Sequence, residues 1–216
     1  MIPGGNEIRR FLASLGTALL ASETEPSAVS DVEHFLALLD ELALPCLPDL
    51  PSLPGRKLPV CRLLPHAIGA TLGRPSREMA LALDELGDEL IWVQSEDYLR
   101  APPSQDFADN YGYAVVAGPP DIAPALVASA RLAAGVMMFG PRSCYPLHRH
   151  PAIELYYVVS GRAEWWRGEG PWLVKEPGTL IHHASGVPHA MRTLQEPLIV
   201  AYLWKGDLHT DASFIA

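Results

Sequence analysis

Cysteine, basic residues and long apolar runs are all scarce in this 216-residue sequence. Cys46, Cys61 and Cys144 lack the C-x-x-C spacing of a zinc knuckle or a redox pair, and such a scattered set is typical of reduced cytosolic thiols. Lys and Arg number 16 against 25 Asp and Glu, so the clustered positive charge that nucleic acids require is missing. No apolar stretch is long enough to cross a bilayer. We therefore expect a cytoplasmic protein whose partner is a small molecule, with no nucleic acid and no membrane involved.

The remaining composition is that of a globular protein with a sizeable core. Hydrophobic residues make up 49% of the chain and charged residues 19%, with a formal net charge of −9. Two arginines followed by an apolar stretch at residues 11–21 superficially resemble a secretory signal. An amphipathic helix is favoured instead, because the large apolar residues of this stretch share one helical face. These residues are Phe11, Leu12, Leu15 and Leu19.

Residues 1–105 carry apolar side chains at helical spacing. One apolar stripe follows Ser30-Asp31-Val32-Glu33, a sequence typical of a capping box. Residues 46–59 are rich in proline and predict an extended linker. A short helix over 63–72 and a longer helix capped by Ser76 complete this N-terminal helical segment. We expect the segment to pack on the rest of the protein.

Residues 106–216 show a different pattern, in which short β-rich runs are separated by Gly and Pro. Eight runs are strand candidates: 111–116, 132–139, 153–160, 163–167, 172–175, 179–182, 190–194 and 198–204. Eight short antiparallel strands predict a closed β-barrel or jelly roll. The predicted fold is therefore mainly β with N-terminal α.

Histidines cluster in the β-rich part. Five of the eight histidines lie between His148 and His189. Side chains alternate between the two faces of a strand, so His148, His150, Glu154 and Tyr156 are expected to point into the barrel together. Because a proline cannot donate a ladder hydrogen bond, the strand is expected to bend or to be unpaired at residue 151.

Two imidazoles and one carboxylate are ligands of borderline hardness. His148, His150 and Glu154 suit Fe(II), Zn, Mn, Co or Ni better than Ca or Mg. A fourth ligand has to come from elsewhere in the chain. The adjacent His182 and His183 face opposite sides of a strand, so at most one reaches the interior, and its role is left open.

The spacing of these residues resembles the two motifs of the cupin superfamily. The first motif, G-x5-H-x-H-x3,4-E-x6-G, is matched from His148 through Glu154 to Gly161, although Gly140 stands two residues too far upstream. The second motif is G-x5-P-x-G-x2-H-x3-N. It is matched by Gly178, Gly186 and His189, with Ala184 in place of the proline and Thr193 in place of the asparagine.

This resemblance implies a cupin β-barrel (jelly roll) preceded by the helical segment. His189 is thereby the fourth ligand, and a single divalent transition metal ion is held by His148, His150, Glu154 and His189. Fe(II) and Zn suit this ligand set, with Mn, Co or Ni as alternatives.

A finer resemblance is to the short cupin-type dimethylsulfoniopropionate (DMSP) lyases. It is carried by residues 145–156, 186–192 and 201–204, by Phe107-Ala-Asp-Asn-Tyr-Gly-Tyr113, and by the N-terminal helical segment and overall length. Its most specific part is the tyrosine pair, Tyr145 and Tyr156, that flanks the His/Glu cluster. The resemblance implies a carbon–sulfur lyase of the dimethylpropiothetin dethiomethylase type, which cleaves DMSP into dimethyl sulfide and acrylate by β-elimination.

Such an elimination implies roles for the residues around the metal. A divalent ion on the substrate carboxylate would stabilise the developing enediolate. Tyr156, on the same face as Glu154, is the first candidate for the base, and in the resembling family the residue at this position is the proposed base and can ligate the metal. Tyr145 is the second candidate, placed to bind substrate or share the proton. Trp204 and Tyr202 share one face of the final strand, and aromatic faces suit the sulfonium of a DMSP-like zwitterion.

Two other functions stay open. The same cage supports other cupin metalloenzymes, such as an Fe(II) dioxygenase acting on a small carboxylate or sulfur compound, and cupins that bind a ligand without turnover. Dioxygen uptake would distinguish a dioxygenase from a lyase. The tyrosine pair argues against a cupin that only binds a ligand, because binding without turnover needs no base. The native metal, the physiological substrate and the existence of a homodimer are left open as well.

Overall fold

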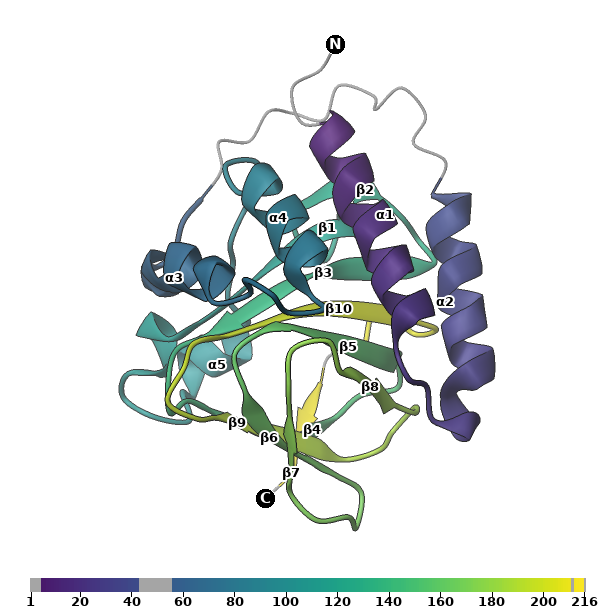
Figure 1. The fold of residues 1–216 in the computed structure, drawn as a ribbon. Coiled ribbons are helices and arrows are strands. Elements are labelled where there is room, and N and C mark those ends of the chain that lie inside the picture. Colours follow the sequence, from purple (N-terminus) through teal and green to yellow (C-terminus); the bar gives the residue numbers. More distant parts are fainter. Residues whose placement is uncertain (1–4, 43–55, 211, 216) are drawn as a thin grey trace.

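The computed structural model describes residues 5–42, 56–210 and 212–215, and its strands form two β-sheets (Figure 1). One sheet contains β1 (Tyr111–Gly118), β2 (Ala125–Ala128), β3 (Leu132–Phe139), β5 (Ile153–Ser160), β8 (Leu180–His183) and β10 (Leu198–Lys205), in the order β2-β1-β3-β10-β5-β8. The other contains β4 (Cys144–Arg149), β6 (Ala163–Arg167), β7 (Leu173–Lys175), β9 (His189–Thr193) and β11 (Ser213–Phe214), in the order β11-β4-β9-β6-β7. Neighbouring strands are antiparallel except β1 and β2.

Five α-helices precede the strands in the described part of the chain. They are α1 (Gly5–Ala21), α2 (Val29–Glu41), α3 (Leu64–Gly69), α4 (Arg77–Leu86) and α5 (Glu96–Arg100). Helices α1, α2 and α4 lie over one face of the six-stranded sheet, and the five-stranded sheet lies on the other side (Figure 1). The predicted architecture, mainly β with N-terminal helices, is confirmed. The boundary between residues 105 and 106 stays a prediction.

The six-stranded sheet is buried on both faces, and alternation along β5 shows how. Leu155, Tyr157 and Val159 belong to the core cluster that includes the apolar faces of α1, α2 and α4. Tyr156 and Val158 belong to the second cluster, which lies between the two sheets. A strand buried on both sides needs apolar residues at nearly every position, and this explains the unbroken apolar run Leu155–Val159.

The predicted strands agree closely with the structure in the central barrel. The runs 132–139, 153–160 and 163–167 match β3, β5 and β6 residue for residue, and the remaining five differ by one or two residues at an end. The predicted amphipathic helix near the start of the sequence is confirmed as α1, whose buried residues are Ile8, Phe11, Leu12, Leu15 and Leu19. Strands β2, β4 and β11 were not predicted as separate strands.

The stretch from Tyr145 to Tyr156 is two strands instead of one. Strand β4 ends at Arg149 in the five-stranded sheet, and β5 begins at Ile153 in the six-stranded sheet. Pro151 lies in the turn between them and cannot continue a hydrogen-bonded ladder. The chain therefore crosses from one sheet to the other inside the histidine motif.

Neither predicted helix cap is formed by a side chain. Helix α2 begins at Val29, directly after a 3-10 turn at Pro26–Ala28, so Ser30 lies inside the helix and the expected capping box is wrong. Ser76 precedes α4, but its Oγ donates to the Val159 carbonyl at 2.6 Å and joins the helix to β5. At Ser76, therefore, a tertiary contact replaces the local cap. The predicted linker 46–59 lies outside the described residues up to residue 55.

An ion pair between a buried lysine and a partly buried aspartate joins α2 to the barrel. Lys205 of β10 is 5% exposed, and its Nζ lies 2.7 Å from Asp31 Oδ1. The other carboxylate oxygen of Asp31 lies 2.9 Å from His182 Nε2. Burial by itself raises the pKa of Asp31, but the hydrogen bonds and charges of Lys205 and His182 outweigh it and lower the pKa below 3.8. The stabilisation is therefore present above pH 3.8 and is lost as the pH falls through the lowered pKa.

Replacing Asp31 by alanine is expected to lower the free energy of unfolding by about 3 kcal/mol, because it leaves the Lys205 ammonium buried without an anion. Chemical denaturation measures this change. The double variant Asp31→Ala/Lys205→Met is expected to recover most of the loss, and Asp40→Ala, at an exposed site on the same helix, is the control. A loss below about 1 kcal/mol, as for a surface pair, would contradict this role.

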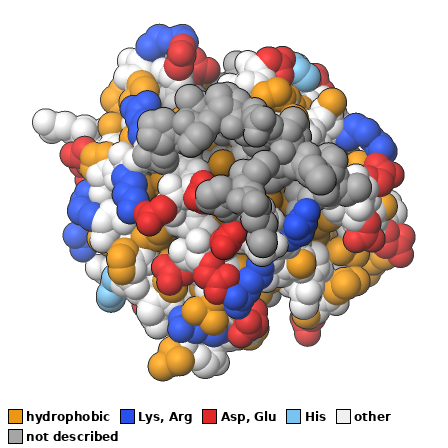
Figure 2. All heavy atoms as spheres, turned by 90° about the horizontal axis from the view of Figure 1, so that it is seen from above, with side chains coloured by type: hydrophobic (Ala, Val, Ile, Leu, Met, Phe, Trp, Pro, Cys, Tyr) orange, Lys and Arg blue, Asp and Glu red, His pale blue; other side chains and the backbone are white. Residues whose placement is uncertain are grey.

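On the face shown in Figure 2, described acidic and basic side chains are interspersed. Among the helices of the described ranges, none has both the length and the apolar character needed to span a membrane.

Candidate metal centre

Four buried side chains meet between the two sheets. His148 lies near the end of β4, His150 follows in the turn, Glu154 is on β5 and His189 begins β9. They are 1%, 3%, 1% and 2% exposed, respectively. His148 and His189 are direct partners in the β4–β9 ladder, which brings the two motifs of the sequence into contact. Because the chain crosses between the sheets at Pro151, His148 and Glu154 reach the same interior from different sheets, with His150 in the turn between them.

The donor atoms of these four residues converge. Ring nitrogens of His148, His150 and His189 all lie within 4.8 Å of one another. Glu154 Oε2 lies 3.3 Å from His150 Nε2 and 3.3 Å from His189 Nε2. Three imidazoles and one carboxylate at these distances form a compact set of nitrogen and oxygen donors, which indicates a site for a divalent metal ion.

Backbone carbonyls set the orientation of each imidazole. The Nδ1 atoms of His148, His150 and His189 lie 2.7, 2.9 and 2.9 Å from the carbonyl oxygens of Pro146, Ala152 and Val187. A carbonyl can only accept, so Nδ1 carries the hydrogen and the Nε2 lone pair is left for the interior. Metal-binding histidines are usually anchored through their second nitrogen in this way.

Burial and mutual charge decide the protonation of the cluster. Burial, together with His189, lowers the pKa of His148 to about 4, so this ring is neutral at pH 7. Burial raises the pKa of Glu154, but hydrogen bonding to His150 outweighs it and holds the pKa well below 4.5. At Glu154 and His148 the site thus offers a carboxylate and a neutral imidazole, the forms that bind metals. At His150 burial lowers the pKa, but the hydrogen bond and charge of Glu154 outweigh burial and raise the pKa.

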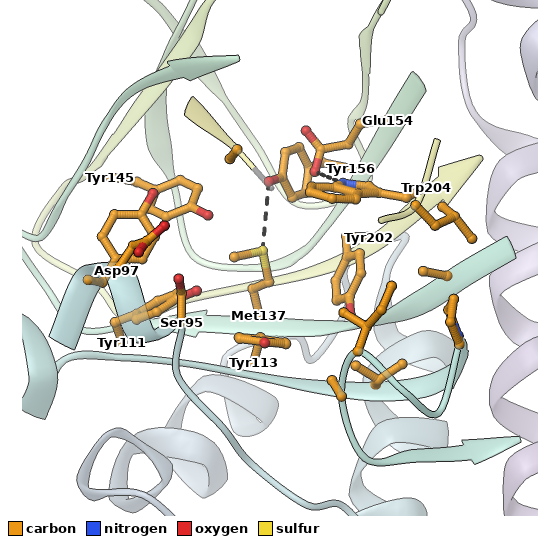
Figure 3. A pocket seen from close by; sticks show the side chains of 18 of the residues that line it. Ser95, Asp97, Tyr111, Tyr113, Met137, Tyr145, Glu154, Tyr156, Tyr202 and Trp204 are labelled. Carbon is orange, nitrogen blue, oxygen red and sulfur yellow. Dashed lines mark hydrogen bonds between the residues drawn. The ribbon is translucent and has the colours of Figure 1, made fainter. Parts of the chain in front are cut away.

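Trp204 holds the carboxylate of Glu154 from the neighbouring strand. The two residues are opposite each other in the β5–β10 ladder, and the indole Nε1 donates to Glu154 Oε1 (Figure 3). The Trp204 ring also packs on His150, with ring centroids 4.2 Å apart. Because Oε1 is occupied, Oε2 is the oxygen that faces the histidines. Trp204 was predicted to contact substrate, and the structure places it against two candidate ligands as well.

A small cavity opens beside Glu154, and all four predicted aromatic site residues line it: Tyr145, Tyr156, Tyr202 and Trp204 (Figure 3). Its volume of about 160 Å³ suits a small molecule. Tyr202 lines the cavity close to Gly135. A Cβ atom at position 135 would come within 2.1 Å of the Ala114 carbonyl oxygen and 3.0 Å of the Tyr202 hydroxyl. Glycine at position 135 therefore leaves room for the tyrosine.

Tyr156 is the cavity residue nearest to Glu154 in sequence, two positions along β5. It is 2% exposed, and its hydroxyl donates to Met137 Sδ at 3.7 Å (Figure 3). Burial, and then the charge of Glu154, raise the pKa of Tyr156 well above 10. In the protein alone the phenol is therefore protonated at neutral pH.

Tyr145 stands on the opposite side of the cavity from Trp204 (Figure 3). It is 8% exposed, and its ring centroid lies 4.7 Å from that of His148. Tyr98, Tyr111 and Phe139 surround it with centroids 5.4, 5.8 and 5.0 Å away. Burial, and then the neighbouring Tyr98, raise the pKa of Tyr145 well above 10.

Several residues around the cavity were missed by sequence reasoning. Tyr98 and Asp97 come from α5, and Phe214 comes from the C-terminal tail, whose β11 pairs with β4 next to His148. Phe214 and Tyr98 are in ring contact at 5.0 Å. Because these residues lie far apart along the chain, no periodic pattern in the sequence groups them.

The adjacent His182 and His183 point in opposite directions, as strand alternation requires. His182 faces outward to Asp31, whereas His183 is fully buried beside His189 and Tyr156. The neighbouring Trp165 likewise reaches the interior, with its ring 5.1 Å from that of Tyr156. The expectation that at most one histidine of the pair enters the interior is confirmed.

Two antiparallel sheets enclosing a His/Glu cluster define the class of this protein as a cupin. Within that class, the chain belongs to the dimethylsulfoniopropionate lyase family, whose model matches residues 33–200. The fold and family implied by the sequence motifs are thereby confirmed.

Individual relatives agree with this assignment. Dimethylsulfoniopropionate lyase DddQ of Ruegeria pomeroyi is 42% identical over 83 residues, which are 38% of this chain and 41% of that protein. A putative dimethylsulfoniopropionate lyase DddL of Cereibacter sphaeroides is 31% identical over 176 residues, covering 81% of this chain and 69% of that protein. A chain from the crystal structures of the DMSP lyases RdDddP and RnDddQII superposes on this chain with a TM-score of 0.71 at 25% sequence identity. The superposition covers 99% of this chain and 100% of that one.

Proposed function

We propose that this chain is a metal-dependent carbon–sulfur lyase that cleaves DMSP to dimethyl sulfide and acrylate by β-elimination. The observation that carries the proposal is the single cavity that joins Glu154 of the His/Glu cluster to Tyr156 and Tyr145. In this reaction the base takes the proton next to the carboxylate. The electron pair forms the carbon–carbon double bond, and the carbon–sulfur bond breaks to release dimethyl sulfide.

The residues of the cluster fit a divalent ion. His189 Nε2 is buried and has no hydrogen-bond partner among the residues described, which is the state expected of a lone pair kept for a metal. His148, His150, Glu154 and His189 would hold the ion, and the donor set suits Fe(II) or Zn, with Mn, Co or Ni as alternatives. When bound, the ion would neutralise the substrate carboxylate and stabilise the charge that develops as the proton leaves.

Tyr156 is the proposed base. Its hydroxyl reaches the cavity from the strand that carries Glu154, and its ring is held in place by Trp165 and by burial. Tyr145, across the cavity, is proposed to bind the substrate or share the proton. To accept the substrate proton, Tyr156 has to be in its phenolate form, with its own hydroxyl proton already lost to solvent. The positive charge of an ion held by the neighbouring Glu154 would favour that form by opposing the rise in pKa that burial causes.

The aromatic wall is proposed to bind the sulfonium. A sulfonium offers no hydrogen-bond donor and is attracted to aromatic faces. Tyr202 and Trp204 line the cavity on the side away from Tyr145 (Figure 3). Because Trp204 also holds Glu154, it would link the substrate wall to the metal ligands.

The proposal is tested by incubating purified protein with DMSP and measuring dimethyl sulfide in the headspace and acrylate in solution. Equal amounts of both products are expected, without dioxygen uptake. A chelator is expected to abolish release, and added metal to restore it. Absence of dimethyl sulfide after loading with each of Fe(II), Zn, Mn, Co and Ni would refute the lyase proposal, whereas dioxygen consumption would indicate an oxygenase.

The cellular setting and assembly remain part of the proposal. Within the described ranges, Cys61 and Cys144 are free thiols, which agrees with a reducing compartment such as the cytoplasm. The homodimer considered from the sequence stays a prediction.

A further inference from the structure

His183 is the buried histidine that the proposed chemistry does not use. It lies on β8, directly opposite Glu154 in the β5–β8 ladder, and its exposure is 0%. Its ring stacks on His189 with centroids 3.9 Å apart and planes 12° apart. Tyr156 closes another side at 5.8 Å. The side chain is therefore enclosed by residues of the candidate metal centre.

Both ring nitrogens of His183 lack a hydrogen-bond partner among the described residues. The three histidines of the other donor group differ, because each anchors Nδ1 on a backbone carbonyl. A neutral imidazole has one donor and one acceptor, and burying both without partners costs free energy that a phenylalanine would avoid. The residue type therefore indicates that a nitrogen of His183 binds something inside the barrel.

The position of these nitrogens indicates what they bind. Donor atoms of Glu154, His183 and His189 lie within 4.8 Å of one another. This triad shares His189 with the triad of His148, His150 and His189. Two donor triads that overlap in one ligand surround a single interior space.

We propose that His183 is a fifth protein ligand of the metal centre, so that four imidazoles and Glu154 surround the cation. The inference rests on the proposed function in one respect only, which is that a divalent ion binds between these side chains. Because the His183 ring stacks on His189, it must tilt to direct a lone pair at the shared ion. No described hydrogen bond holds the ring against that tilt.

The first test counts imidazole ligands in the unaltered protein loaded with Zn. X-ray absorption at the Zn edge is expected to require four imidazoles in the coordination sphere. A fit with three imidazoles would overturn the assignment of His183. Failure of the protein to bind any divalent metal would instead overturn the metal site of the proposed function.

The second test separates ligation from packing. His183→Phe keeps a ring against His189 but removes both nitrogens. It is expected to weaken Zn affinity by at least about 100-fold, more than the loss of a residue that only orients a ligand, as measured by competition with a chelating dye. His182→Phe is the matched control, because the adjacent ring faces Asp31 outside the barrel, and it is expected to change affinity less than about twofold. Unchanged affinity in folded His183→Phe would show that the ring only packs. The imidazole count decides the matter if this variant does not fold.

Discussion

Replacing Tyr156 by phenylalanine is expected to lower the rate of dimethyl sulfide release by about 10³-fold, because it removes the proposed base and leaves the ring packed on Trp165. The hydroxyl donates to the soft sulfur of Met137 at 3.7 Å, which is a weak hydrogen bond, so its loss should cost little stability. Zn content is expected to remain near that of the unaltered protein. The measurements are headspace dimethyl sulfide under saturating DMSP and metal analysis of the same sample.

Tyr157→Phe is the control for this result. Tyr157 follows Tyr156 on β5 but faces the helices, where it belongs to the outer core cluster. The same hydroxyl is lost from the other side of the strand, and activity should be unchanged. If Tyr156→Phe kept more than about a tenth of the rate while Tyr145→Phe abolished it, the roles of the two tyrosines would be exchanged.

Replacing His189 by alanine is expected to remove both the metal and the activity. His189 is the residue shared by the two donor triads, and it joins β9 to the ligands of β4 and β5. We expect Zn affinity to fall by at least about 100-fold, more than for a residue that only orients a ligand. Activity should fall with metal occupancy and recover in part at high metal concentration.

His209→Ala controls for the general loss of a histidine. His209 is exposed and lies 3.5 Å from the carboxylate of Asp121 at the surface. Its removal should change neither Zn binding nor product release. A His189→Ala protein that retained tightly bound metal and full activity would contradict the proposed ligand set.

Alternation of side chains was the most informative feature of the sequence. On β5 it correctly separates Glu154 and Tyr156, which face the interior, from Ile153 and Leu155, which face the helices, because side chains alternate between the two faces of a strand. The same rule separates His182 from His183. Wherever a strand was predicted correctly, alternation also predicted which side chains face the interior.

Alternation failed as an argument where the chain changes sheets. His148 and Glu154 lie on different strands, and their meeting depends on the turn at Pro151 and on β9 bringing His189 opposite His148. The prediction that these side chains point into the barrel together was correct, but it assumed one continuous strand where the chain forms two strands and a turn. The pairing of β4 with β9 is a long-range contact for which a single sequence contains no periodic signal.

The helix caps and the cavity wall show the same limit. Ser30 and Ser76 match local capping patterns, yet Ser30 lies inside α2 and Ser76 Oγ donates to the Val159 carbonyl. Phe214 reaches the cavity only because β11 adds to the edge of β4. These contacts join distant parts of the chain and are decided by packing.

Because the six-stranded sheet is buried on both faces, its outer face can stabilise the fold while its inner face forms the cavity. Helices α1, α2 and α4 supply an apolar backing to β3, β5 and β10, so much of the hydrophobic stabilisation of these strands arises behind the reaction chamber. The inner face is thereby free to carry buried polar groups and an open space, both of which weaken a core. Substitutions that reshape the chamber can therefore be tolerated as long as the helical backing stays intact.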